Sequence, residues 1–296
     1  MNTNDRDDIA FLQTLNSLYP DKVRLVPQPD GVVQGNASIN AFFRECVDED
    51  TVYVRLDDDI VWIEEEFFEK FLKFRIDNPQ YFLVYPMIVN NAICTYFLKA
   101  YGFINTPFHL RANAMDKNSW ENSKFAYNLH NLFIARIMNN TYEDWKIGVI
   151  PIGSNRFSIN CISWFGKEFR SFDGEIKGDE EEYLTVLKPA MLGKTNCIYG
   201  NTIVVHYSFF TQRDYLDSTD LLIKYEKILN STNDGELLDI YRNVMEYPFE
   251  HSVKRSNWAR IFKFKIKVYA YRGYSYLRMK YKSHFGIIIT DGVSRQ

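Results

Sequence analysis

The sequence has few cysteines, no long apolar run and no recognisable signal peptide. Its four cysteines lie far apart, at positions 46, 94, 161 and 197, without a CxxC pair. This spacing argues against a zinc knuckle or a disulfide scaffold and is typical of a reducing compartment. No apolar stretch approaches the roughly 18–20 residues of a membrane span, and the polar, acidic start is unlike a signal peptide. We therefore expect a cytoplasmic protein that is soluble or bound at the inner face of a membrane.

Acidic residues are missing from one long segment near the C-terminus. Residues 252–290 contain ten basic residues and no acidic one, interleaved with aromatic residues. Residues 1–250 carry 37 acidic against 24 basic residues. The basic segment favours an amphipathic helix on an anionic membrane surface. The alternatives are docking on the acidic body and nucleic-acid binding, and since nothing else resembles a nucleic-acid module, we predict no nucleic-acid partner.

Hydrophobic residues are abundant, at 46% of the chain, and aromatic residues make up 16%. This composition is sufficient for a large core. Apolar periodicity predicts helices over 7–20, 63–79, 123–138 and 178–192, two helices within 213–247, and strands over 22–28, 51–56, 80–89, 157–166 and 202–210. The alternation of strands and helices predicts an α/β fold, with a mainly parallel sheet flanked by helices.

Three consecutive aspartates, Asp57, Asp58 and Asp59, follow the apolar segment 51–56. Ligands of open α/β sheets bind beyond the carboxyl ends of the strands, and Mg²⁺ and Mn²⁺ prefer oxygen ligands. The run therefore predicts a cation site. The alternative is the N-terminus of a helix that begins just after Trp62, where acidic residues interact favourably with the helix dipole.

Two later features carry further candidate residues. The acidic segment 178–184 offers Asp179, Glu180 or Glu181 as a general base if burial or like charges raise its pKa. The alternative is a solvated helix start. His206 follows a β-branched run and is either a buried core histidine or an additional metal ligand.

The order of these features resembles that of glycosyltransferases with the GT-A fold, of the family 2-like nucleotide-sugar transferases. The resemblance covers residues 1–215. Within it, "GNASINAFF" resembles the loop and helix before the DxD strand, and "NTND" resembles the end of the first nucleotide-binding strand. It implies a GT-A catalytic domain over 1–215, with its first strand cut short, and a helical extension over 216–296 that ends in the basic aromatic tail.

The resemblance also implies a role for each candidate residue. These roles are Mn²⁺ or Mg²⁺ binding by Asp57, Asp59 and His206, donor binding by Asp57, Asp58, Asn4 and Arg213, and proton abstraction by Asp179 or Glu180. The implied reaction moves a sugar from a nucleotide-sugar donor to a hydroxyl acceptor, a glycan or a lipid-linked saccharide, with inversion.

Two other functions stay open. "DDDIV" also fits the DxDx[TV] motif of haloacid-dehalogenase-like phosphatases, in which Asp57 would attack phosphorus and Asp59 would act as acid and base. The Ser/Thr and Lys of that family cannot be assigned convincingly, and its nucleophile strand normally comes first. The other function is a non-catalytic α/β module that binds through its tail.

Overall fold

The computed structural model describes residues 1–153, 155–231, 235, 238–240 and 242. These residues belong to one compact unit that spans Met1–Pro248. The basic segment 252–290, for which we predict membrane contact, lies outside the described residues, and the domain boundary at residue 215 stays a prediction. Among the described helices, none combines the length and the apolarity of a bilayer-crossing segment.

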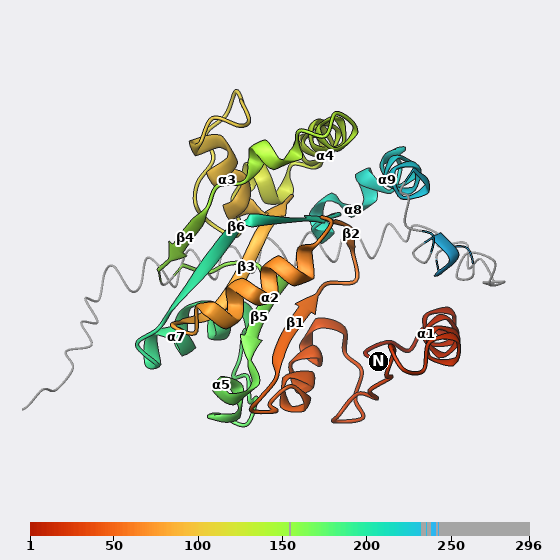
Figure 1. Ribbon diagram of the computed structural model, residues 1–296, viewed down its shortest axis with the longest axis vertical. Coiled ribbons are helices and arrows are strands. Elements are labelled where there is room, and N and C mark those ends of the chain that lie inside the picture. The colour runs from red at the N-terminus through yellow and green to blue at the C-terminus, as the bar shows by residue number, and fades with distance from the viewer. Residues whose placement is uncertain (154, 232–234, 236–237, 241, 243–296) are drawn as a thin grey trace, which may run out of the picture. The chain divides into compact units, whose positions relative to one another are not determined.

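Six strands form one open sheet (Figure 1). They are β1 (Val52–Leu56), β2 (Ile60–Ile63), β3 (Tyr81–Val89), β4 (Val149–Ile152), β5 (Cys161–Phe165) and β6 (Thr195–His206). The strand order is β1-β5-β3-β6-β2, and β4 pairs with the first half of β6.

The sheet is mixed, so the prediction of a mainly parallel sheet was wrong. Only β3 and β6 pair in parallel, and every other described pair is antiparallel. The error has a local cause. Parallel neighbours need a long crossover, and the short strands β2 and β4, which interrupt the apparent strand–helix alternation, were not predicted. The fold is nevertheless α/β, with helices flanking the sheet.

The strands β1 and β2 lie at opposite ends of the strand order, yet only Asp57, Asp58 and Asp59 separate them. Four strand spacings would place these strands about 19 Å apart in a flat sheet. The Ile60 N–H instead donates to the Asp57 carbonyl at 3.2 Å, which makes a tight turn. The sheet therefore curls, and its two edges approach each other at the carboxyl end of β1 (Figure 1).

Helices pack on both sides of these strands. The α-helices are α1 (Arg6–Leu18), α2 (Phe67–Asp77), α3 (Ala92–Ala100), α4 (Ser123–Met138), α5 (Gly166–Arg170), α6 (Glu180–Glu182), α7 (Lys188–Met191), α8 (Phe210–Leu216) and α9 (Leu221–Asn230). The 3₁₀ and π segments are η1 (Gly35–Ala37), η2 (Ile39–Glu45), η3 (Lys117–Glu121), η4 (Tyr142–Trp145) and η5 (Tyr183–Leu187). Helix α2 contacts β6 and β1, α3 and α4 contact β3, and α8 and α9 pack against α4.

Three details of the N-terminal region differ from the predictions. Residues 22–28, predicted as a strand, form none, and no described strand pairs with them. The "NTND" segment is irregular, and Asp5 caps helix α1 by accepting from the Asp7 and Asp8 amides. No helix begins directly after Trp62, since β2 continues to Ile63 and α2 begins only at Phe67.

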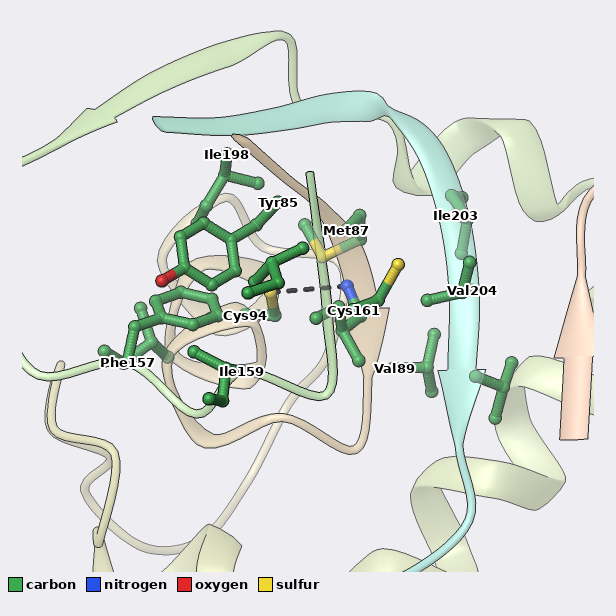
Figure 2. Close-up of a cluster of buried hydrophobic side chains, with 14 of the residues drawn as sticks. Tyr85, Met87, Val89, Cys94, Phe157, Ile159, Cys161, Ile198, Ile203 and Val204 are labelled. Atoms are coloured by element: carbon green, nitrogen blue, oxygen red, sulfur yellow. Dashed lines mark hydrogen bonds between the residues drawn. The ribbon is translucent and has the colours of Figure 1, made fainter. Parts of the chain in front are cut away.

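The core packs around the central strands β3, β5 and β6. Figure 2 shows Tyr85, Met87 and Val89 of β3 packed with residues of β5 and β6, namely Cys161, Ile198, Ile203 and Val204, all fully buried. Burying one such side chain contributes about 1.5–3 kcal/mol. Because Val89 precedes Asn90 and Val205 precedes His206, this core fixes the strand ends that carry polar residues.

Candidate metal centre

The three aspartates occupy the turn between β1 and β2. Asp58 is exposed, whereas the side chains of Asp57 and Asp59 are only 24% and 12% exposed. The turn is followed by a strand, so the helix-start interpretation of these acidic residues was wrong. Two carboxylates are thus held partly out of solvent, and the third projects into it.

His206 reaches the same place through the pairing of β2 with β6. Ile60 is in register with His206, and the Tyr207 N–H donates to the Asp59 carbonyl at 2.8 Å. The buried His206 ring lies with Nε2 3.3 Å from Asp59 Oδ1. One ligand atom from each of Asp57, Asp59 and His206 lies within 4.8 Å of the others. These three residues can therefore form a metal-binding group, as the sequence predicts.

The hydrogen bond on the far side of the imidazole sets its tautomer. His206 Nδ1 lies 3.2 Å from the Asn90 carbonyl oxygen, which can only accept. Nδ1 therefore carries a proton, and in the neutral ring the Nε2 lone pair faces Asp59. Metal-ligating histidines commonly donate their other N–H to a carbonyl in this way.

Two arginines balance the carboxylates. Arg213 Nη2 donates to Asp59 Oδ2 at 2.7 Å, and Arg55 Nη2 donates to Asp57 Oδ1 at 3.1 Å. Burial raises the pKa of Asp59, and electrostatic attraction to His206 and Arg213 opposes this rise. The arginines orient both carboxylates and leave Asp59 Oδ1 facing the histidine.

The acidic segment contributes Glu180 to the surroundings of this group. Arg55 bridges Asp57 and Glu180, because its Nη1 donates to Glu180 Oε1 at 2.5 Å. Burial raises the pKa of Glu180 to about 7, against the opposing effect of Arg55. A carboxylate with a pKa near neutrality suits a general base.

Asp179 is placed differently from its neighbour. It caps α6 by accepting from the Glu182 amide, and Arg156 donates to its Oδ2 at 3.0 Å. Arg156 also pairs with Glu181. Of the two catalytic acids predicted from the sequence, Glu180 is the one linked to Asp57 through a single residue.

The remaining predicted donor-binding residues lie in two settings. Arg213 contacts Asp59 directly, and its side chain is 40% exposed. Asn4 is exposed in the irregular segment before α1, not at the end of a strand. A cavity of about 380 Å³ lies elsewhere, between the 104–108 loop and helix α4, and none of the predicted site residues lines it.

Sequence reasoning missed Arg55 and three asparagines, Asn90, Asn91 and Asn160. Asn160 donates to Asp57 Oδ2 at 3.0 Å and accepts from the Asp57 amide at 2.9 Å. The positions of the asparagines in the sequence could have pointed to them. Asn90 and Asn91 directly follow the apolar segment 81–89, and Asn160 directly precedes the strand that begins at residue 161.

No protein-family model, curated protein or solved structure matches this chain. The fold and the centre define an α/β protein with an Asp-Asp-His group that can bind a metal ion.

Proposed function

We propose that the protein is a metal-dependent glycosyltransferase that moves a sugar from a nucleotide-sugar donor to a hydroxyl acceptor, with the GT-A fold. The observation that carries this proposal is the convergence of Asp57, Asp59 and His206 at one sheet edge, with Glu180 one residue away through Arg55. Such a transfer needs a cation that neutralises the leaving group and a base that deprotonates the acceptor. The metal-binding group and the neighbouring carboxylate, whose pKa is near 7, can provide these two functions.

The donor atoms favour Mn²⁺ over Mg²⁺ as the cation. Mg²⁺ prefers all-oxygen surroundings, whereas imidazole nitrogen is a good ligand for softer divalent ions. Two carboxylates and one imidazole therefore suit Mn²⁺. When bound, the cation neutralises charge on the leaving nucleoside diphosphate.

Each residue near the metal-binding group has a separate role in the proposed reaction. Asp57, Asp59 and His206 hold the cation, and Arg213 is sufficiently exposed to pair with a donor phosphate. Asp58 points into solvent, where it can contact the ribose or the sugar. Glu180 accepts the proton of the acceptor hydroxyl. A single base on one side of the donor is consistent with inversion.

The acceptor in this proposal is a glycan or a lipid-linked saccharide, and the basic segment 252–290 contacts an anionic membrane at its cytoplasmic face. The full-length chain should then co-sediment with anionic vesicles at low salt and less at high salt, because salt screens the attraction. Equal pelleting with zwitterionic vesicles would remove this electrostatic contact from the proposal.

Titration calorimetry with Mn²⁺ and a panel of nucleoside diphosphates tests the proposal. We expect nucleotide binding that requires Mn²⁺ and is lost in Asp59→Ala. The matched control is Asp50→Ala, an exposed aspartate at the opposite end of β1, which should bind like the wild type. Metal binding without nucleotide binding would instead indicate a non-catalytic metal-binding module.

The phosphatase alternative has less support from the geometry. A nucleophilic Asp57 needs an oxygen free to attack, yet Asn160 and Arg55 each donate to one of its two oxygens. Turnover of a generic aryl phosphate, lost in Asp57→Asn, would establish the phosphatase and refute the transferase.

A further inference from the structure

The junction between β3 and α3 consists of two buried asparagines, Asn90 and Asn91, which are 2% and 1% exposed. Asn90 has a positive φ of 63°, a conformation that asparagine tolerates better than most residues. Its side chain donates to the Tyr207 carbonyl at 3.0 Å and to Gln212 Oε1 at 2.9 Å. The junction is thereby tied to the segment that follows His206.

Asn91 starts a directional chain of hydrogen bonds that ends at Asp57. Its Oδ1 caps α3 by accepting from the Ile93 and Cys94 amides, so its Nδ2 must be the donor on the other side. That Nδ2 donates to Asn160 Oδ1 at 3.1 Å. Asn160 must then present its own Nδ2, which donates to Asp57 Oδ2 at 3.0 Å. The side chain of Asp57 is thereby held in one orientation.

Asn90 provides the corresponding control of the histidine through its main chain. Its carbonyl accepts from His206 Nδ1 at 3.2 Å, which turns Nε2 toward Asp59. Two neighbouring residues therefore orient two side chains, Asp57 and His206, that lie far apart in the sequence.

We propose that Asn90 and Asn91 are positioning residues that set the Asp57–Asp59–His206 group to receive a cation. They hold the side chain of Asp57 in one orientation through Asn160, and they hold the His206 ring with Nδ1 at the Asn90 carbonyl and Nε2 toward Asp59. This inference rests on the metal site of the proposed function and assigns that site its supporting residues.

The substitution Asn91→Ser keeps the cap of helix α3 and removes the hydrogen bond to Asn160. Serine caps a helix about as well as asparagine, so α3 keeps its N-terminal acceptor, but serine carries no amide to donate to Asn160. Asn122→Ser is the matched control, because Asn122 caps α4 in the same way and does not contact the metal group. Loss of supporting hydrogen bonds typically weakens metal binding about 10–100-fold.

Mn²⁺ affinity, measured by electron paramagnetic resonance of free Mn²⁺, should fall about 10–100-fold in Asn91→Ser and stay unchanged in Asn122→Ser. Circular dichroism confirms that both variants are folded. If the wild type binds Mn²⁺ and Asn91→Ser binds it equally well, the positioning role is refuted while the proposed function stands.

A metal-free measurement tests the histidine half of the proposal. Long-range ¹H–¹⁵N spectra of the full-length protein should show that the neutral His206 ring carries its proton on Nδ1. A neutral ring with its proton on Nε2 would mean that the Asn90 carbonyl does not orient the imidazole, and it would overturn the proposal. A wild type that binds no Mn²⁺ refutes both proposals, whereas a wild type that binds Mn²⁺ without nucleotide refutes only the proposed function.

Discussion

Glu180 gives the sharpest test of how the acidic segment is packed. Burial raises the pKa of its carboxyl from 4.5 to about 7, although Arg55 opposes the rise. The native state then binds this proton more tightly than the unfolded state, so stability is highest below pH 4.5 and falls as the pH rises toward 7. The loss amounts to about 3 kcal/mol, because one pH unit of pKa difference is worth about 1.4 kcal/mol. The side chain is only 15% exposed, so solvent screening reduces this figure little.

Glu180→Gln removes the titration and keeps the shape of the side chain. The free energy of unfolding of the variant, relative to the wild type, should therefore increase by about 3 kcal/mol between pH 4.5 and pH 8. Urea denaturation at several pH values measures this difference. Glu69→Gln, on the exposed face of α2, reports the effect of net charge alone. A Glu180→Gln difference that stays constant with pH would refute the inferred burial of this carboxyl.

Two further substitutions test the interactions around the sheet. Arg55→Met leaves two partly buried carboxylates without their shared cation, and at pH 8 it should lower the free energy of unfolding by about 3 kcal/mol. The loss should be smaller at pH 5, where Glu180 is protonated, and urea titrations at both pH values decide this. Asn196 is buried, accepts from the Leu83 amide and donates to the Thr185 carbonyl. Asn196→Ala should cost about 3 kcal/mol in the same assay, whereas Asn201→Ala, at an exposed position, should cost much less.

The sequence predicts the elements whose patterns are local. The helix over 123–138 is observed as Ser123–Met138, because Asn122 caps it and its buried side recurs at helical spacing. The strands over 51–56 and 80–89 contain mainly apolar and β-branched residues, and both form. Strand direction is not local, since β2 pairs with a strand some 140 residues later and its four residues carry no sign of that partner.

The site was predictable to the extent that its residues have a recognisable chemistry. Asp57, Asp59 and His206 stand out because each follows an apolar strand, and the structure brings them together. The choice between Asp179 and Glu180 depends on which side chain faces Arg55, and adjacent acids in a helix start give no such information. The asparagines were missed because an amide at a strand end usually marks a turn, and its role here depends on partners distant in sequence.

Because the sheet curls, the aspartate turn joins its two edge strands, β1 and β2. Asp59 meets Arg213 across 154 residues of chain, and closing a loop of that length costs roughly 4 kcal/mol of chain entropy. A ligand that bridges Asp57 and His206 would hold the ends of β1 and β6 together after this cost has been met. The bound ligand should therefore mainly slow the unfolding of the sheet. Ligand binding at this centre would then lengthen the lifetime of the folded state.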